Sequence, residues 1–439
     1  MEGDRSEWQR GAARSLNKLA SRPGLPALWA AVALAIFLAG ISAPSLWIDE
    51  GHAWAYASRS LGSILSTTVG QTNAVEAPYY VLLHLWIRVA GDSELSLRLP
   101  SAVAMAVAVW ATAKVAFDTA GTRAALAAGF VMVALPGVTR YAQEARPYAF
   151  VVAGVALSTL FLLRGLTRSE RRWWAGYGAS IALVGYFHVL SLLVMAGQLV
   201  VVVLVDRQRW RPFVVAAALA LFCVAPIAVL GFAQRGQIAW IPPVQFDWLW
   251  SGLSALTGSL AASACIGVIA IYGSGRGRLF IVGLSMAIAT PILLWTIGHF
   301  GPWYLARYLL GAAPGIALVA AAGLASAKGV RALVVACLLA ALVLPQHISL
   351  RDPASHGQDY RSAAQLVATD CSAAIRYDGM SRDAMTYYLQ HQSCAPSEGA
   401  SSARLWVVQA EGPQVAEPGY QLLSSNAYGS ALVTYWVRK

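Results

Sequence analysis

The stretch Trp47-Ile48-Asp49-Glu50-Gly51-His52-Ala53-Trp54 follows directly on the first long apolar run of the chain. A helix that starts near Leu25 and crosses a bilayer would leave it close to Pro44, which puts Asp49 and Glu50 at the membrane surface. Ionisable side chains are costly to place at a membrane, and by default they mark a functional site. The sequence therefore predicts that this acidic pair belongs to a site at one face of a membrane.

The composition is that of a chain that crosses a membrane many times. Of 439 residues, 58% are hydrophobic and 12% are charged, and repeated apolar runs approach the ~20 residues that a spanning helix needs. The net charge is +11, yet the part from Leu350 onward holds 7 basic and 8 acidic residues, so the positive excess lies in the membrane part. This placement indicates positively charged cytoplasmic loops and argues against a nucleic-acid partner.

One apolar segment, residues 79–90, is too short to cross the bilayer. It has about a dozen residues, which fits a helix on the membrane surface better than a span. Tyr80, His84 and Arg88 recur every fourth residue and form one polar stripe, which we expect to face water. If this segment does not cross, alternate loops collect the arginines, as the positive-inside rule requires.

The sequence therefore predicts a polytopic α-helical membrane protein with a cytoplasmic N-terminus. We expect a basic cytoplasmic segment over 1–24, a transmembrane domain over 25–347 with a catalytic outer loop over 47–97, and an extracytoplasmic domain over 348–439. The eleven predicted spans are residues 25–41, 98–117, 124–139, 148–163, 173–187, 189–205, 213–232, 248–272, 279–298, 308–326 and 331–347.

The part after residue 347 has the pattern of a small α/β domain. Short strands are expected around 371–375 and 405–408, with helices near 360–368 and 384–390. Cys371 and Cys394 could form a disulfide if this part lies outside the cytoplasm, and the sequence leaves that pairing open.

Carboxylates and arginines that share one outer face suit a particular chemistry. When a sugar leaves a polyprenyl phosphate, charge develops on the phosphate oxygen, and a guanidinium can stabilise that charge. The attacking hydroxyl needs a carboxylate to take its proton. One carboxylate with one or two arginines is therefore a minimal site for glycosyl transfer with inversion.

Five short pieces of the chain carry a resemblance to a known family. They are Trp-Ile-Asp49-Glu50-Gly-His52, Pro78-Tyr79-Tyr80-Val-Leu-Leu-His84, Ser93-Glu94-Leu-Ser-Leu-Arg98-Leu-Pro100, Tyr141-Ala-Gln143-Glu144-Ala-Arg146-Pro147-Tyr148 and Ala306-Arg307-Tyr308-Leu. In this order they resemble the GT-C glycosyltransferases, in particular the bacterial family 39 relatives of protein O-mannosyltransferases and lipid A aminoarabinose transferases. The resemblance implies a GT-C-like fold with two juxtamembrane helices in the first outer loop.

The resemblance also implies roles for single residues. Asp49 would be the catalytic base that activates the acceptor, and Glu50 its catalytic neighbour, which orients the acceptor or the lipid head. Glu144 would hold the sugar or a metal ion, while Arg146 and Arg307 would contact the lipid phosphate. The further donor-binding residues implied are His52, Tyr80, Arg88 and Tyr308.

The chain departs from its relatives at one place. They usually read His-Pro-Pro-Leu-Tyr-Tyr, or Lys in the first position, where this chain has Glu76-Ala77-Pro78-Tyr79-Tyr80. A basic or imidazole contact is therefore missing there. The sequence leaves open whether a divalent metal is bound, and Glu76 and Glu144 are its candidate ligands.

The implied function is transfer of one sugar, with mannose favoured, from a polyprenyl-phosphate donor to a hydroxyl acceptor on the outer side of the plasma membrane. The acceptor could be a protein, a glycolipid or a polysaccharide. Two rivals remain: a transporter or flippase of polyprenyl lipids, whose polar residues would line a cavity at mid-membrane, and a non-catalytic subunit that binds prenyl lipids. Charged residues that cluster at the ends of the predicted spans favour surface chemistry.

Purely structural roles are the other alternative for the same residues. Asp49 could cap the helix that follows it, Glu144 and Arg146 could form a local ion pair, and Arg307 could extend from the membrane to the interface.

Overall fold

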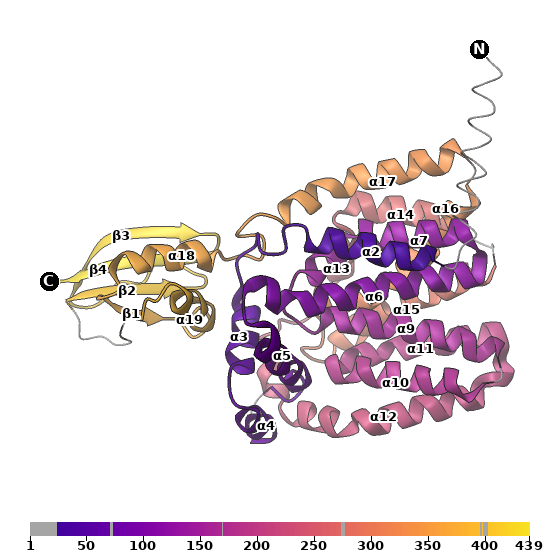
Figure 1. Ribbon diagram of the computed structural model, residues 1–439, viewed down its shortest axis with the longest axis horizontal. Helices are drawn as coiled ribbons and strands as arrows, with labels where there is room; N and C mark the ends of the chain where they lie inside the picture. The colour runs from indigo at the N-terminus through magenta and orange to yellow at the C-terminus, as the bar shows by residue number, and fades with distance from the viewer. Residues whose placement is uncertain are drawn as a thin grey trace, which may run out of the picture.

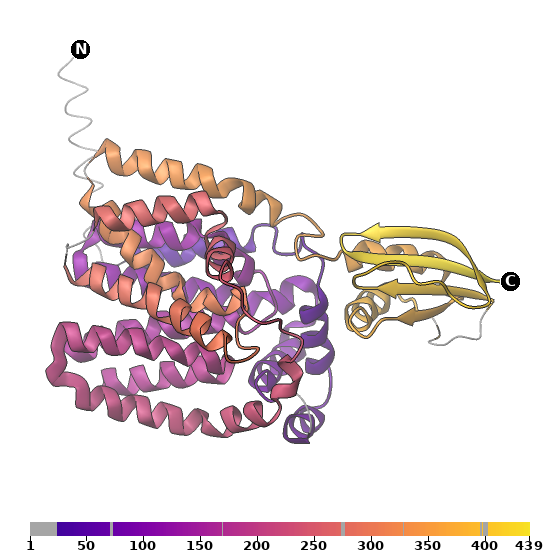
Figure 2. The same cartoon turned by 180° about the vertical axis from the view of Figure 1, so that it is seen from behind.

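The computed structural model describes residues 24–70, 73–168, 170–273, 277–327, 329–395, 397 and 403–439. A bundle of helices makes up most of this structure, and a small sheet domain extends from one end of the bundle (Figures 1 and 2). The first half of the bundle comprises α2 (Leu25–Leu38), α3 (Ile48–Ala57), α4 (Leu61–Gly70), α5 (Ala77–Ala90), α6 (Glu94–Ala120), α7 (Thr122–Ala134), α8 (Pro136–Ala142), α9 (Tyr148–Thr167) and α10 (Arg171–Phe187). The second half comprises α11 (Val194–Asp206), α12 (Trp210–Ala233), α13 (Trp248–Thr257), α14 (Leu260–Tyr272), α15 (Arg278–Gly298), α16 (Ala313–Ser326) and α17 (Val330–Ser349).

Small residues let the apolar helices approach one another closely, as is usual where lipid surrounds a bundle. A Cβ atom on Gly323 of α16 would lie 2.0 Å from the Ile269 carbonyl oxygen of α14. A Cβ atom on Gly283 of α15 would lie 2.4 Å from the Val319 backbone nitrogen of α16. Helix α16 is therefore packed backbone to backbone between its neighbours, and it is almost entirely buried.

Each of the eleven predicted spans coincides with a helix or a pair of helices. By length and apolarity alone, six helices among the described residues could cross a membrane, or up to eight if each bent pair is one span. That number treats residues 189–233, which contain α11 and α12, as one run. The protein is thus a multi-span helical membrane protein, and the count of eleven stays a prediction.

Two segments that we expected to be single spans are broken. Residues 124–139 divide into α7 and α8, which meet at 66°, because Pro136 cannot continue a helix and holds Leu135 in an extended conformation. Residues 248–272 divide into α13 and α14, which meet at 86°. Here Gly258 adopts a left-handed conformation (φ +96°) and the side chain of Ser259 caps α14.

Three helices, α3, α4 and α5, lie in the first outer loop, where the resemblance implied two. Helix α5 covers the segment that we predicted to lie on the surface, but its polar stripe does not face water as expected. Tyr80 and His84 are buried and only Arg88 is exposed. The reason is that α5 packs against α3: Tyr80 stacks on Tyr56 at 5.1 Å and His84 Nδ1 lies 2.8 Å from the Ala57 carbonyl oxygen.

The C-terminal domain is a four-stranded sheet with two helices. The strand order is β1-β2-β4-β3, in which β1 (Ala374–Tyr377) runs parallel to β2 (Arg404–Gln409) and the β3–β4 hairpin (Tyr420–Tyr428, Ala431–Arg438) is antiparallel. Helices α18 (Tyr360–Val367) and α19 (Arg382–His391) lie where the sequence predicted helices. Cys371 and Cys394 form a disulfide.

The two parts of the molecule are in close contact. Helix α19 lies against α3 (Figure 1), and a Cβ atom on Gly51 would lie 2.6 Å from the Ala384 backbone nitrogen. The segment that follows α17 returns to the bundle, where the Ser45 backbone nitrogen donates to the Pro353 carbonyl oxygen at 2.9 Å. The acidic motif of α3 therefore lies at the junction of the two parts.

Candidate active site

Asp49 lies between two guanidinium groups that come from distant parts of the chain. Its Oδ2 is 3.6 Å from Arg146 Nη2, in the turn between α8 and α9, and 3.5 Å from Arg307 Nη1, at the start of the 3₁₀ helix η4 (Ala306–Ala312). This oxygen is buried and has no hydrogen-bond partner among the described residues. A buried polar atom without a partner in native protein calls for an explanation, and a bound ligand is one.

Asp49 is not the capping residue of α3. The helix begins at Ile48, and Trp47 occupies the N-cap position without a side-chain cap. Asp49 and Glu50 fall in the first turn, where the helix dipole favours negative charge. Adjacent residues of a helix point about 100° apart, which allows the two carboxylates to have different surroundings.

Glu50 is fully buried and bound on both oxygens. Arg98 donates to Oε1 from Nε at 2.8 Å and to Oε2 from Nη2 at 2.6 Å, and the Ala145 backbone N–H donates to Oε1 at 2.7 Å. Burial alone would raise the pKa of Glu50, but the Arg98 guanidinium outweighs it and holds that pKa at about 2. Arg98 also donates to the carbonyl oxygens of Ile41, Pro44 and Ser45. The pair therefore joins α3 to α6 and to the turn that carries Arg146, a connection that sequence reasoning did not predict.

Arg146 is held by Glu76, the residue at which this chain departs from its relatives. Glu76 Oε1 accepts from Arg146 Nη2 at 2.5 Å, and its other oxygen accepts from the Tyr80 hydroxyl. Burial would raise the pKa of Glu76, but Arg146 prevails and lowers it. Glu76 is thus an ionised carboxylate that orients Arg146, and Tyr80 acts on the site only through Glu76.

Arg307, the second guanidinium beside Asp49, is followed by Tyr308, which belongs to a group of aromatic rings. The Tyr308 ring lies 4.4 Å from the ring of His188, which lies 6.0 Å from that of Tyr148. Burial, with Arg307 nearby, lowers the pKa of His188 to about 4, so this imidazole is neutral at physiological pH. The Nε of Arg146 and the Nε of Arg307 are both buried without a hydrogen-bond partner among the described residues, and these donors remain available to an anion.

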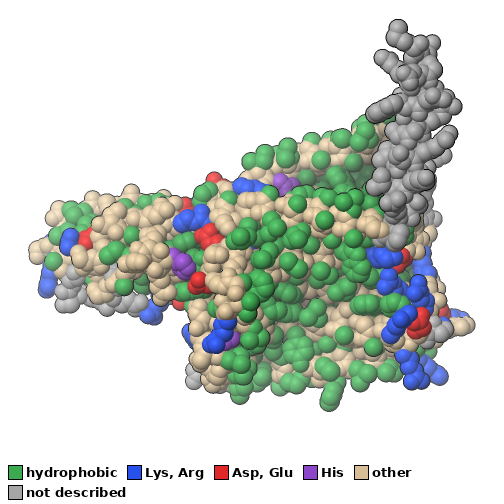
Figure 3. All heavy atoms as spheres, in the orientation of Figure 1, with side chains coloured by type: hydrophobic (Ala, Val, Ile, Leu, Met, Phe, Trp, Pro, Cys, Tyr) green, Lys and Arg blue, Asp and Glu red, His purple; other side chains and the backbone are tan. Residues whose placement is uncertain are grey.

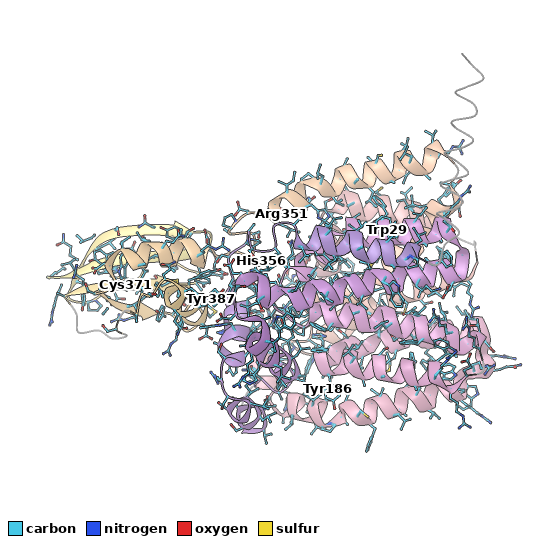
Figure 4. The ribbon with its side chains drawn as sticks, viewed as in Figure 1. Trp29, Tyr186, Arg351, His356, Cys371 and Tyr387 are labelled. Carbon is cyan, nitrogen blue, oxygen red and sulfur yellow. A yellow bond between two sulfur atoms is a disulfide. The ribbon has the colours of Figure 1, made fainter. Side chains whose placement is uncertain are left out.

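Glu144 lies in a separate buried group. Its Oε1 accepts from Arg140 Nε at 3.0 Å, so the local ion pair is with Arg140 rather than with Arg146. Oε1 is also 3.8 Å from Nε2 of His356, whose Nδ1 is 3.9 Å from Glu50 Oε2. His356 comes from the segment between α17 and α18 and lies at the junction of the bundle and the C-terminal domain (Figure 4). No pattern near His356 linked it to the motifs some 200 to 300 residues earlier in the sequence.

The structure does not bring all predicted donor-binding residues together. Arg88 is exposed and lines, with His84 and Asp92, a separate pocket of about 230 Å³ beside α3 and α5. His52 lies one turn beyond Asp49 on α3, and its Nδ1 is 2.5 Å from Asp383 Oδ2 of α19. Sequence reasoning placed Asp383 next to a predicted helix but gave it no role.

The two candidate metal ligands do not fit a metal site. Within the described ranges, no group of three or more His, Cys, Asp and Glu side chains is arranged to hold a metal ion. Glu76 and Glu144 are each paired with an arginine, which a cation would have to displace.

The charges of the molecule are divided between its two ends. Hydrophobic side chains cover the bundle between them, and Lys and Arg gather at the end away from the C-terminal domain (Figure 3). That end holds the turns between α6 and α7, between α9 and α10, and between α11 and α12. The Asp49 group lies at the opposite end, next to the C-terminal domain, so its polar residues do not line a mid-membrane path.

Comparison with known proteins agrees with this architecture. Residues 77–230 match the family model described as dolichyl-phosphate-mannose-protein mannosyltransferase. No curated protein sequence matches the chain. Among solved structures, the chain is similar to ArnT from Cupriavidus metallidurans bound to undecaprenyl phosphate, with a TM-score of 0.63 at 12% identity over 94% of this chain and 98% of that one.

The same protein in the apo state gives a TM-score of 0.64 at 13% identity, over 93% of this chain and 97% of that one. The likeness thus extends through the bundle and the C-terminal domain. The resemblance inferred from the five motifs is confirmed, and the chain has the fold of the GT-C glycosyltransferases.

Proposed function

We propose that this protein is an inverting glycosyltransferase that moves a sugar from a polyprenyl-phosphate donor to a hydroxyl acceptor. The observation that carries the proposal is the position of Asp49 between Arg146 and Arg307 at one end of an apolar bundle. Similarity to a structure described as bound to undecaprenyl phosphate supports a lipid-linked donor. The family model over residues 77–230 makes mannose the first sugar to test.

The proposed reaction is a single displacement at C1 of the sugar. The acceptor oxygen attacks C1 while Asp49 takes the hydroxyl proton, and the new C1–O bond forms as the bond from C1 to the phosphate oxygen breaks. The electron pair leaves on the phosphate, whose charge Arg146 and Arg307 stabilise. Glu50 is saturated by Arg98 and Ala145, so we assign it a positioning role and not a direct contact with the acceptor.

Other residues on the donor side support Asp49, Arg146 and Arg307. Glu76 and Tyr80 orient Arg146, and Tyr308 borders Arg307. Glu144 has one buried oxygen, Oε2, without a hydrogen-bond partner in the described part of the chain, and we propose that it accepts from a sugar hydroxyl. No step is assigned to a metal ion.

We also propose the location and orientation of the protein. The arginine-rich end of the bundle would face the cytoplasm, and residues 348–439 would form an extracytoplasmic domain at the outer face of the plasma membrane. The Cys371–Cys394 disulfide supports this orientation, because disulfides persist in oxidising compartments.

The test is a transfer assay with the full-length protein in lipid nanodiscs. The donor is undecaprenyl phosphate that carries radiolabelled mannose, and the acceptor pool is the washed cell envelope of cells that lack this protein. We expect Asp49→Asn to reduce transfer by roughly 10²–10⁴-fold, the usual contribution of a general base, while undecaprenyl phosphate still binds.

A second variant and a control separate binding from chemistry. Arg307→Gln should weaken undecaprenyl phosphate binding by about tenfold or more, because a charge-assisted hydrogen bond is lost. Arg235→Gln removes the same charge from an exposed position after α12 and should change neither quantity. Unchanged turnover of Asp49→Asn would remove Asp49 from the mechanism, and labelled lipid that changes leaflet in liposomes without any glycoside product would favour a flippase.

A further inference from the structure

The C-terminal domain contributes a charged side chain to the motif that carries Asp49. Asp383, the second residue of α19, places Oδ2 2.5 Å from Nδ1 of His52. His52 lies three residues after Asp49, so the two side chains share one face of α3. The bond joins residues that are 331 positions apart in the chain.

The docking of α19 on α3 holds this pair in place. Gly51 allows the backbone of α19 to approach so closely that a Cβ atom there would lie within 2.8 Å of three atoms of Ala384. One turn after Asp383 on α19, the Tyr387 ring lies 5.2 Å from that of Trp54 on α3. Asp383 is therefore set beside His52 by the contacts that α19 makes with α3 directly after it in the chain.

The other edge of the His52 ring is available to a substrate. Nδ1 bonds to Asp383, which leaves Nε2 as the ring nitrogen that a substrate can meet. The side chain of His52 is 35% exposed, which leaves room for a ligand. The charged groups that face the ring are Asp383 of α19, Asp49 of α3 and Glu76 before α5; the hydrogen bond to Asp383 is the largest influence, and together they raise the pKa of His52.

We propose that Asp383 is a positioning residue for the transfer reaction and that it directs Nε2–H of His52 to an oxygen of the acceptor substrate beside Asp49. This inference rests on the proposed function. Arg146 and Arg307 lie 3.6 Å and 3.5 Å from Asp49 Oδ2, and we assign both guanidinium groups to the donor phosphate. His52 lies one turn further along α3, against the C-terminal domain, where an acceptor from outside the membrane would arrive. The donor-side role that the family resemblance gave His52 is therefore replaced by an acceptor-side role.

The experiment compares Asp383→Asn and His52→Gln with Tyr387→Phe in the nanodisc assay described above. Tyr387→Phe is the matched control, because it removes the hydrogen bond from the Tyr387 hydroxyl to the Asp92 carbonyl oxygen but keeps the ring against Trp54 and does not touch His52. We expect Asp383→Asn and His52→Gln to raise the amount of cell envelope that gives half-maximal transfer by about tenfold, the value of a charge-assisted hydrogen bond. The Kd for undecaprenyl phosphate should change by less than about twofold.

A pH profile separates positioning from a merely structural role. A histidine with a raised pKa keeps its charge below that pKa and loses it as pH rises. Removing the negative charge of Asp383 lowers the pKa of His52, so transfer by Asp383→Asn should fall off at a lower pH than transfer by the wild type. Asp383→Glu, which keeps the charge, should restore the wild-type profile, and Tyr387→Phe should not shift it.

Failure of the proposed function can be distinguished from failure of the roles given to Asp383 and His52. If the wild type transfers no sugar from any labelled donor, the proposed function fails. If the wild type transfers sugar but Asp383→Asn behaves as Tyr387→Phe does, the role of Asp383 is overturned. If His52→Gln weakens undecaprenyl phosphate binding and leaves acceptor saturation unchanged, His52 belongs to the donor and the acceptor assignment is overturned.

Discussion

Asp49 and Glu50 show how neighbouring carboxylates of one motif acquire different surroundings. Asp49 has an oxygen that nothing in the described chain satisfies, next to two arginines. Glu50 is completely enclosed and makes three hydrogen bonds. A carboxylate that is to take a proton must meet a substrate, whereas one that is saturated by a buried arginine holds structure. The pairing with Arg98 thus distinguishes them, and the sequence motif does not.

The residue-scale prediction concerns the Glu50–Arg98 pair. Glu50→Gln leaves a buried guanidinium without its counter-charge and should lower the free energy of unfolding by about 3–5 kcal/mol. The double variant Glu50→Leu with Arg98→Met removes both charges and should recover most of that loss. Thermal unfolding in nanodiscs measures both, with Asp49→Asn as the neighbouring control. Equal stability of Glu50→Gln and the wild type would contradict the structural role.

The same pair should make stability depend on pH. The pKa of Glu50 is about 2 in the folded protein against 4.5 for the free group. A lowered pKa contributes stability that is complete above the unfolded value and is lost as pH falls from there toward the folded value. The wild type should therefore lose more stability between pH 5 and pH 2 than the double variant does, provided that other groups titrate alike in both.

At the scale of elements, the shape of the site depends on where helices end and on how closely two helices pack. The break at Pro136 frees α8 and the following turn to carry Arg140, Glu144 and Arg146 to the end of the bundle. The closeness of α3 and α19 depends on Gly51, since a side chain there would collide with backbone atoms of Ala384. Backbone atoms cannot move aside as the tip of a flexible side chain can.

The element-scale prediction is that Gly51→Ala separates α19 from α3. The overpacked contact should cost about 1–3 kcal/mol of stability. It should also expose two arginines to trypsin: Arg351, between α17 and α18, and Arg361, at the start of α18. Gly62→Ala in α4 is the matched control, because a Cβ atom there meets nothing within 4 Å. Equal rates of cleavage in the two variants would show that the approach at Gly51 is not needed for docking.

At the scale of the whole molecule, the two ends of the bundle differ in charge and in what they carry. One end gathers Lys and Arg side chains (Figure 3), and the other carries the Asp49 group beneath the C-terminal domain. The disulfide within that domain joins Cys371, which precedes β1, to Cys394, which follows α19. Helix α19 is the helix that docks on α3. The orientation that we propose rests on this polarity, through the positive-inside rule.

The whole-molecule prediction is an asymmetric labelling pattern. In a variant without the free cysteines Cys223, Cys265 and Cys337, single cysteines are introduced at two exposed positions. A membrane-impermeant maleimide applied to spheroplasts should label Glu411→Cys in the C-terminal domain. It should label Arg172→Cys, in the first turn of α10, only after the membrane is permeabilised. The reverse pattern would invert the proposed orientation.

The sequence by itself determined the membrane class, the helical segments, the α/β character of the first part of the C-terminal domain and the motifs of the GT-C fold. These follow from apolar run length, loop charge and short patterns, which are properties of neighbouring residues. The β3–β4 hairpin, the breaks within two spans and the burial of Tyr80 and His84 were not predicted, because each depends on what packs against the segment.

Only the tertiary structure decided which charges meet. Three pairs join residues that are far apart in the sequence. Glu50 pairs with Arg98 at a separation of 48 positions, and Glu76 pairs with Arg146 at a separation of 70. Asp383 bonds to His52 at a separation of 331. The free energy of an ion pair depends on the separation of its atoms and on their burial. Neither quantity can be read from the sequence. The motifs therefore identified the charged residues of the site, and the fold determined which of them pair.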